Sequence, residues 1–191
     1  MRNVSRILPL LPGLAALTGC GQAQKSNEQN SKKPNIIYIY SDDLGIGDLS
    51  CYGATKISTP NIDRLAGQGA QFTNAYATSA TSTPSRFGLL TGMYPWRQEN
   101  TGIAPGNSEL IIDTACVTMA DMLKEAGYAT GVVGKWHLGL GPKGGTDFNG
   151  QISPNAQSIG FDYEFVIPAT VDRVPCVFVE NGRVAGLDPK D

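Results

Sequence analysis

The stretch that decides the local fold reads STPSRFGLLTG and spans Ser82–Gly92. It predicts a helix, because Pro84 suits the first turn, where its missing N–H costs nothing, and Gly92 suits the exit. A helix N-terminus carries unpaired N–H groups and partial positive charge, which favour a bound anion. Arg86, one turn after Ser82, can offer that anion a fork of hydrogen-bond donors. An exposed Ser/Thr-rich turn before an ordinary helix is the other interpretation of this stretch alone.

An apolar, β-rich run lies upstream at Asn35–Tyr40 (NIIYIY) and predicts a strand buried on both faces. Asp42 and Asp43 follow it. Adjacent residues of a strand point to opposite faces, so the two carboxylates converge only where the strand is ending. Open α/β sheets bind ligands at the carboxyl ends of parallel strands, and oxygen ligands suit a hard cation such as Ca²⁺. A solvated acidic pair at a strand exit is the alternative.

Helical and strand patterns alternate along the rest of the chain, which indicates the α/β class. The expected helices cover residues 60–68 and 119–126, and the expected strands cover 70–77, 129–133 and 161–167. A Gly/Pro-rich segment at 141–157 predicts a long surface loop, and Asn181-Gly182 predicts a tight hairpin turn.

The strand expected at 129–133 runs into GKWHLG, Gly134–Gly139, which contains His137, the only histidine of the 191 residues. A lone histidine in a loop is more often a surface residue than a catalytic one. The pattern by itself therefore leaves the role of His137 open.

Three motifs together resemble the type I sulfatase family. Ser82–Gly92 resembles its first signature and Gly127–His137 resembles its second, and the acidic pair stands before both with family-like order and spacing. The resemblance covers essentially residues 34–165. It implies an alkaline-phosphatase-like α/β sandwich with a central, mostly parallel sheet, and it implies hydrolysis of sulfuric esters.

The resemblance also implies how the nucleophile is made. Ser82 would be the precursor of formylglycine (3-oxoalanine), produced by the serine-type formylglycine-generating radical enzyme in the cytoplasm before export. The hydrated aldehyde has two hydroxyls on one carbon. One attacks sulfur and displaces the alcohol, and the other expels sulfate as the aldehyde reforms.

The remaining roles are likewise those that the resemblance implies. Asp42 and Asp43, together with residue 82, would bind a divalent cation, Ca²⁺ with Mg²⁺ as the alternative, that orients the sulfate oxygens and neutralises their charge. The catalytic support would come from Arg86 on the aldehyde hydrate, Lys135 on residue 82 and the sulfate, and His137 in sulfate release.

Family members are longer, and their second half supplies further metal ligands and sulfate-binding groups that have no counterpart in these 191 residues. We therefore interpret residues 34–191 as the N-terminal part of a sulfatase catalytic domain. On this interpretation the 191 residues alone are expected to be inactive and to bind metal poorly.

Two other functions stay open at this point. A phosphate or phosphonate ester hydrolase of the same superfamily is the nearest enzyme alternative, and a catalytically silent, lipid-anchored glycan-binding protein is the alternative without chemistry. For the sulfatase, attachment to a bacterial envelope suggests a sulfated carbohydrate as substrate.

The N-terminus indicates export. Residues 1–19 combine Arg2 and Arg6 with a short, broken apolar segment, which is typical of a signal peptide. Residues 17–20 (LTGC) resemble a bacterial lipobox, so Cys20 is the expected lipidation site and residues 20–33 a flexible tether. This predicts a lipoprotein of the bacterial cell envelope, periplasmic or attached to the outer membrane. A plain signal peptide is the alternative.

Net charge and cysteine spacing argue against a nucleic-acid-binding protein and against a zinc site of cysteines. Removal of Arg2 and Arg6 changes the formal net charge from −2 to about −4, which does not favour nucleic acid. The cysteines show no CxxC spacing of the kind that zinc sites use.

Overall fold

The computed structural model describes residues 33–188 and divides into two compact units at Tyr40–Ser41. In the first unit the described residues, 33–40, are extended and belong to no strand. The strand expected at Asn35–Tyr40 is therefore wrong for this structure: Ile37 and Ile39 are 85% and 79% exposed. A strand is buried on both faces only between neighbours, and no strand within residues 33–188 pairs with this run. The expected signal peptide and the Cys20 lipidation site lie outside the described residues.

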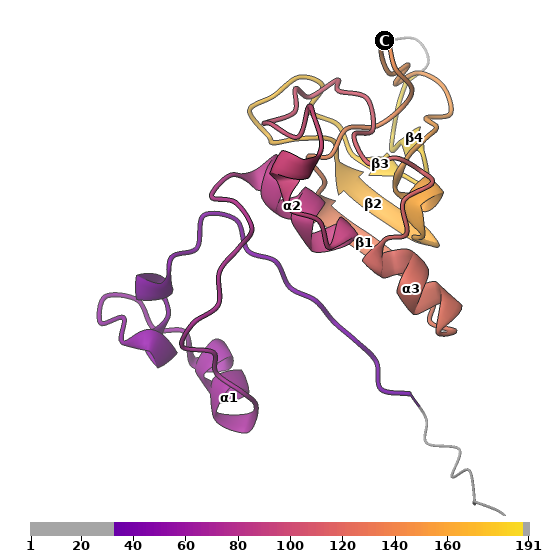
Figure 1. The fold of residues 1–191 in the computed structure, drawn as a ribbon. Helices are drawn as coiled ribbons and strands as arrows, with labels where there is room; N and C mark the ends of the chain where they lie inside the picture. The colour runs from indigo at the N-terminus through magenta and orange to yellow at the C-terminus, as the bar shows by residue number, and fades with distance from the viewer. Residues whose placement is uncertain (1–32, 189–191) are drawn as a thin grey trace, which may run out of the picture. The chain divides into compact units, whose positions relative to one another are not determined.

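The second unit contains three α-helices and four 3₁₀ helices among its described residues, and capping residues mark several of their ends (Figure 1). The α-helices are α1 (Pro60–Gln68), α2 (Ser82–Thr91) and α3 (Met119–Glu125), with the 3₁₀ helices η1 (Ile46–Asp48), η2 (Ser50–Tyr52), η3 (Pro95–Arg97) and η4 (Ala156–Ile159). Thr118 caps α3 in a reciprocal arrangement: its hydroxyl accepts from the N–H of Asp121, whose carboxylate accepts from the N–H of Thr118. Helix α2 ends at Gly92, whose φ of 67° is the left-handed conformation of a glycine stop.

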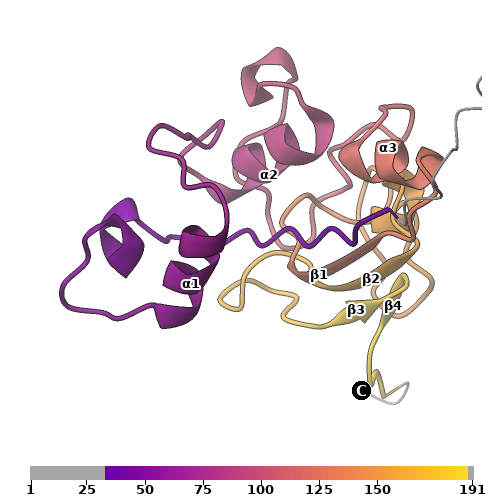
Figure 2. The ribbon, with the colours of Figure 1, turned by 90° about the horizontal axis from the view of Figure 1, so that it is seen from below.

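One four-stranded mixed sheet is present among the described residues (Figure 2). Its strands, in spatial order, are β1 (Gly131–Lys135), β2 (Tyr163–Ile167), β3 (Val179–Glu180) and β4 (Arg183–Val184). Strands β1 and β2 are parallel, and the other two pairings are antiparallel. The expected Asn181-Gly182 turn joins β3 to β4, with positive φ at both residues.

The strand expected at 70–77 does not form. This segment has no strand assignment, and Phe72 and Tyr76 are 68% and 87% exposed. In the described part of the chain, no neighbouring element covers the apolar side chains of this segment. The alternating pattern alone is therefore not enough to form a strand.

The core joins α2, α3 and the sheet to the loop that follows β1. Its buried members include Phe87 of α2, Ala120 of α3 and Val166 of β2. Trp136, at the start of the loop, packs edge-on against Phe161 with ring centroids 6.3 Å apart. The same loop pairs through its backbone with residues 108–111. The residues that precede and follow His137 are thus anchored in the core, which fixes where its side chain lies.

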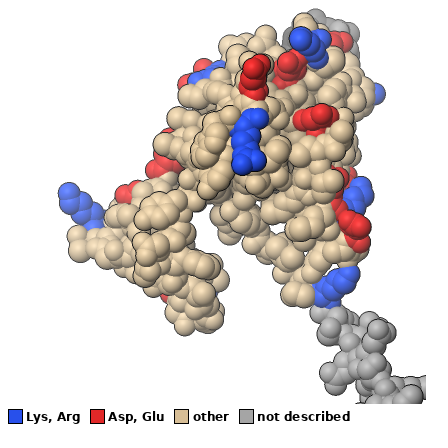
Figure 3. Space-filling model, viewed as in Figure 1, with Lys and Arg blue, Asp and Glu red and all other residues tan. Residues whose placement is uncertain are grey.

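The surface carries charge of both signs. On the face drawn in Figure 3, Lys and Arg side chains are interspersed with Asp and Glu side chains among mostly uncharged residues. Within residues 33–188, no helix has both the length and the apolar character that a membrane span requires. The thiols of Cys51, Cys116 and Cys176 are all free.

Candidate active site

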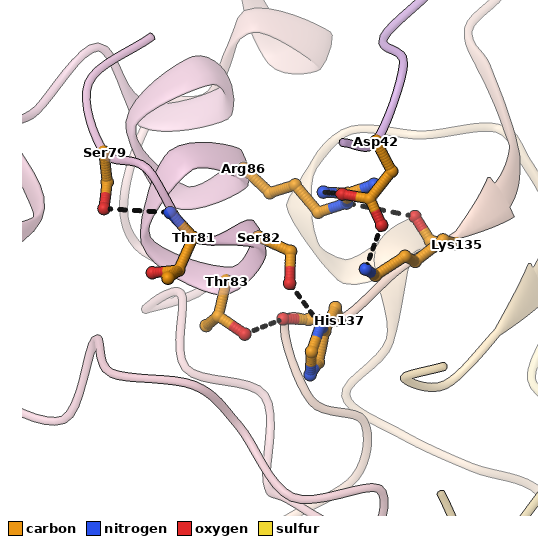
Figure 4. Close-up of polar contacts among 8 residues, drawn as sticks. All are labelled: Asp42, Ser79, Thr81, Ser82, Thr83, Arg86, Lys135 and His137. Carbon is orange, nitrogen blue, oxygen red and sulfur yellow. Dashed lines mark hydrogen bonds and ion pairs between the residues drawn. The ribbon is translucent and has the colours of Figure 1, made fainter. Parts of the chain in front are cut away.

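Ser82 is the first residue of α2, and its side chain points at the loop that follows β1 (Figure 4). Its Oγ lies 2.7 Å from Nδ1 of His137. Thr81 is extended, with φ −115° and ψ 155°, so the chain turns abruptly into the helix at Ser82. The serine hydroxyl is consequently half-buried at a helix N-terminus and next to the one histidine of the sequence.

His137 has a partner for every polar group. Its backbone N–H donates to the carbonyl of Pro168 at 3.0 Å, and its own carbonyl accepts from Thr83 Oγ1 at 2.8 Å. Its ring Nε2 lies 2.9 Å from the carbonyl oxygen of Ala104. The residue is 1% exposed and its φ is 56°, a left-handed conformation that costs a non-glycine residue on the order of 1 kcal/mol. These contacts hold the residue in that conformation and fix its ring.

The contact with Ala104 decides which ring nitrogen carries the proton. A carbonyl oxygen only accepts, so Nε2 of His137 must be the donor. In the neutral ring Nδ1 is then an acceptor, and the hydroxyl of Ser82 donates to it. Burial, with a smaller contribution from nearby cations, lowers the pKa of His137 below its ordinary value of 6.5. The neutral form is therefore favoured near pH 7, and the pair has the geometry of a hydroxyl nucleophile beside a base.

A second cluster lies on the other side of Ser82 and joins Asp42, Arg86 and Lys135 (Figure 4). Nη1 of Arg86 lies 3.4 Å from Oδ1 of Asp42, and Nζ of Lys135 pairs with Oδ2. Nε of Arg86 also donates to the carbonyl of Lys135 at 3.3 Å. The hydrogen bond from Lys135, and then the charge of Arg86, hold the pKa of Asp42 below its ordinary value. This cluster is more open than the histidine, since the Asp42 side chain is 39% exposed.

Positive charge outweighs negative charge around the Ser82 hydroxyl. Three cations, Lys135, Arg173 and Arg86, act on His137. Two carboxylates offset them in part: Asp42 pairs with Arg86 and Lys135, and Asp172 interacts with Arg173 and Lys135. The N-terminus of α2 adds partial positive charge at the same place. An oxyanion such as a sulfate or phosphate ester matches this surplus.

The donors for a divalent cation are only partly assembled. Asp42 offers a carboxylate but is occupied by Arg86 and Lys135, whereas the side chain of Asp43 is exposed and forms no hydrogen bond to this cluster in the described structure. No group of three His, Cys, Asp or Glu residues suited to a metal gathers within residues 33–188. The oxygen chemistry suits Ca²⁺, but these residues do not complete a coordination shell.

The structure therefore brings together five of the predicted site residues, Asp42, Ser82, Arg86, Lys135 and His137, and leaves out Asp43. Sequence reasoning missed the Thr83 hydroxyl and the Ala104 carbonyl, which bond His137, and the Arg173 guanidinium, which bonds the Ala104 carbonyl. Thr83 stood inside the first motif as an unassigned residue. Nothing in the sequence marked Ala104 or Arg173, because their role depends on a backbone carbonyl and on tertiary contact.

Two curated proteins illustrate the similarity to known sequences. N-acetylgalactosamine-6-O-sulfatase of Bacteroides thetaiotaomicron is 90% identical over 192 aligned residues, which cover 100% of this chain and 38% of that protein. Arylsulfatase A of Homo sapiens is 43% identical over 150 residues, which cover 76% of this chain and 27% of that protein. The chain thus spans about two fifths or less of the length of these relatives.

Solved structures and family models show the same similarity to sulfatases. A structure from work on the metabolism of multiple glycosaminoglycans by Bacteroides thetaiotaomicron matches with a TM-score of 0.83 and 93% identity, over 84% of this chain and 34% of that one. The fold is accordingly the alkaline-phosphatase-like α/β fold of sulfatases. The model of the family described as Sulfatase matches residues 34–172, which is well over half of the sequence. This chain belongs to the sulfatase family.

Proposed function

We propose that the protein to which this chain belongs hydrolyses sulfate esters of carbohydrates, with residue 82 as its nucleophile. The observation that carries the proposal is the placement of Ser82 between the neutral His137 ring at 2.7 Å and the Asp42–Arg86–Lys135 cluster. Membership of the sulfatase family supports sulfate as the transferred group.

We further propose that Ser82 is oxidised to formylglycine by a serine-type radical enzyme. The modified side chain supplies a hydrated aldehyde, which can take up and then release sulfate. In support, Ser82 is the sole serine or cysteine in the sequence that is followed by the x-Pro-x-Arg pattern. Its half-buried place beside a base and two cations is one that a nucleophile requires.

The side chains of this chain then have distinct tasks. Arg86 is 8% exposed and also bonds the Lys135 carbonyl, so its guanidinium supplies a largely buried positive charge near residue 82. The Lys135 side chain is less buried, 21% exposed against 10% for Arg86, and its ammonium can exchange Asp42 for a sulfate oxygen. The Nδ1 of His137 accepts a proton from a hydroxyl on residue 82 and holds it while the ring stays bonded to Ala104.

A divalent cation is the proposed cofactor, Ca²⁺ with Mg²⁺ as the alternative. Asp42 and Asp43 would contribute carboxylates and residue 82 an oxygen, and the cation would supply neutralisation of sulfate charge. The described residues offer this partial donor set only. Asp42 is paired with Arg86 and Lys135, so a divalent cation must compete with these two side chains for its carboxylate.

For the substrate, we propose 6-O-sulfated N-acetylgalactosamine within a glycosaminoglycan. The support is similarity: the relative that is 90% identical carries the name of that activity, and the matched structure comes from work on glycosaminoglycan metabolism. The sequence of residues 1–20 further supports a proposal of export, lipidation at Cys20 and attachment to the bacterial cell envelope. Incorporation of labelled palmitate that is lost in Cys20→Ala tests the anchor.

The test of the activity compares three substrates with the protein as its bacterial host produces it. Release of sulfate from 6-O-sulfated N-acetylgalactosamine, and not from the 4-O-sulfated sugar, is the expected result. Nitrophenyl phosphate is the third substrate and should react at least tenfold more slowly than nitrophenyl sulfate. Faster hydrolysis of the phosphate ester would replace the proposal with a phosphatase, and no hydrolysis of any ester would favour a binding protein.

A further inference from the structure

Thr83 is completely buried, and its hydroxyl bonds outside its own helix. Oγ1 donates to the carbonyl of His137 at 2.8 Å and accepts from the N–H of Ala104 at 3.1 Å. A threonine near a helix start ordinarily bonds its own helix or water. Here one hydroxyl instead joins α2 to two other segments: the loop after β1, through the contact with His137 drawn in Figure 4, and the segment around residue 104.

Both backbone polar groups of Ala104, its N–H and its carbonyl, are hydrogen-bonded. Its N–H donates to Thr83, and its carbonyl accepts from Nε2 of His137 at 2.9 Å and from Nη1 of Arg173 at 3.1 Å. Arg173 comes from the chain beyond β2, so three side chains from separate segments of the sequence hold the backbone of Ala104. The carbonyl that selects the proton position on His137 is therefore itself positioned.

We propose that Thr83 and Arg173 are positioning residues that act through the backbone N–H and carbonyl of Ala104 to keep the His137 proton on Nε2 and its Nδ1 open toward residue 82. The proposal rests on the proposed function for its effect on catalysis, because only there does Nδ1 receive a proton. Its structural part, the placement of the proton on the ring, stands independently of any activity.

Two variants of Thr83 distinguish this positioning role from a role in packing alone, because the two roles predict opposite orders of severity. Thr83→Val keeps the shape and volume of the side chain and removes the hydroxyl, whereas Thr83→Ser keeps the hydroxyl and removes a methyl group. If packing alone matters, valine is the milder change. If the hydroxyl positions Ala104 and His137, serine is the milder change. Arg173→Met and Arg173→Lys form the matching pair on the other side of the carbonyl, at a half-buried position.

The first experiment is ¹⁵N NMR of the histidine ring in the 191-residue chain, at a pH of about 8, where the ring is neutral. The spectrum is unambiguous because the sequence contains one histidine. We expect a protonated Nε2 and an unprotonated Nδ1 in the unmodified chain. Thr83→Val and Arg173→Met should lose this signature in favour of mixed tautomers, and Thr83→Ser and Arg173→Lys should retain it. An Nδ1-protonated ring in the unmodified chain, or an unchanged signature in both disruptive variants, overturns the proposal.

The second experiment measures kcat and KM for the natural-length protein. Thr83 lies within the Ser-x-Pro-x-Arg pattern, so its substitution can change how much of residue 82 is converted to formylglycine, and kcat is therefore normalised to the modified fraction. Thr83→Val should lower kcat on the order of tenfold with KM little changed, and Thr83→Ser should restore it. Should Thr83→Val fail to fold, Arg173→Met and Arg173→Lys decide the question by the same two readouts. An inactive parent protein would contradict the proposed function while leaving the NMR result to judge the positioning.

Discussion

The two sides of residue 82 differ in how completely they are built. On the His137 side, every polar group is partnered and the ring is 1% exposed. On the Asp42 side, a 39% exposed carboxylate is held by two cations. The difference indicates a division of labour, because a buried network fixes geometry and an accessible ion cluster can exchange partners. We infer that the histidine side positions the nucleophile and that the Asp42 side receives sulfate and metal.

The largest effect on activity is expected for Ser82→Ala, which removes the side-chain oxygen that lies between the His137 side and the Asp42 side. Turnover should fall by a factor of at least about 10³ because no covalent step can occur. Secondary structure should be unchanged, since the side chain is half-buried and makes one hydrogen bond among those described. Steady-state assays with circular dichroism on the same sample check this. Retained turnover with a normal fold would place the nucleophile elsewhere.

Removal of the histidine tests the buried side. His137→Ala leaves Ser82 Oγ and the Ala104 carbonyl without the ring, in an interior where unmade hydrogen bonds are costly. The free energy of unfolding should fall by about 2 kcal/mol, measured by urea denaturation. A loss within error of zero would show that the network does not contribute to stability.

Acidification tests the same side without mutation. The folded-state pKa of His137 lies below the ordinary 6.5, so the unfolded chain takes up the proton more readily. Its contribution to stability is therefore fully present above pH of about 6.5 and is lost as the pH falls through the folded-state pKa. Urea midpoints between pH 8 and pH 5 should decline more steeply for the native sequence than for His137→Ala. Parallel declines would contradict the assignment.

The smallest effect on stability is expected on the open side. Asp42→Asn breaks ion pairs that water already screens, so the free energy of unfolding should change by less than about 1 kcal/mol. Activity and Ca²⁺ dependence should nevertheless be strongly reduced, which calorimetry and assays of the natural-length protein measure. A large stability loss with normal activity would reverse the roles of the two sides.

The sequence predicted the elements whose signals are local. The α2 boundaries follow from Pro84 and Gly92, and the hairpin follows from Asn181-Gly182. The runs at 35–40 and 70–77 failed because a strand needs neighbours that cover its faces, and the described chain provides none there.

The site shows the same limit. Ser82, Arg86, Lys135 and His137 were found because their motifs carry chemistry in their residue types. The left-handed backbone of His137, the position of its proton and the contribution of Arg173 depend on contacts between segments far apart in the chain. No local pattern of residues encodes such contacts.

The most direct test of the central claim is the mass of the peptide that contains residue 82, measured in an active preparation from the native host. Oxidation of serine to formylglycine removes two hydrogens, so the peptide should be about 2 Da lighter than its sequence. Sulfate-ester turnover should rise in proportion to this modified fraction across preparations. Full turnover by protein whose Ser82 is entirely unmodified would contradict the account.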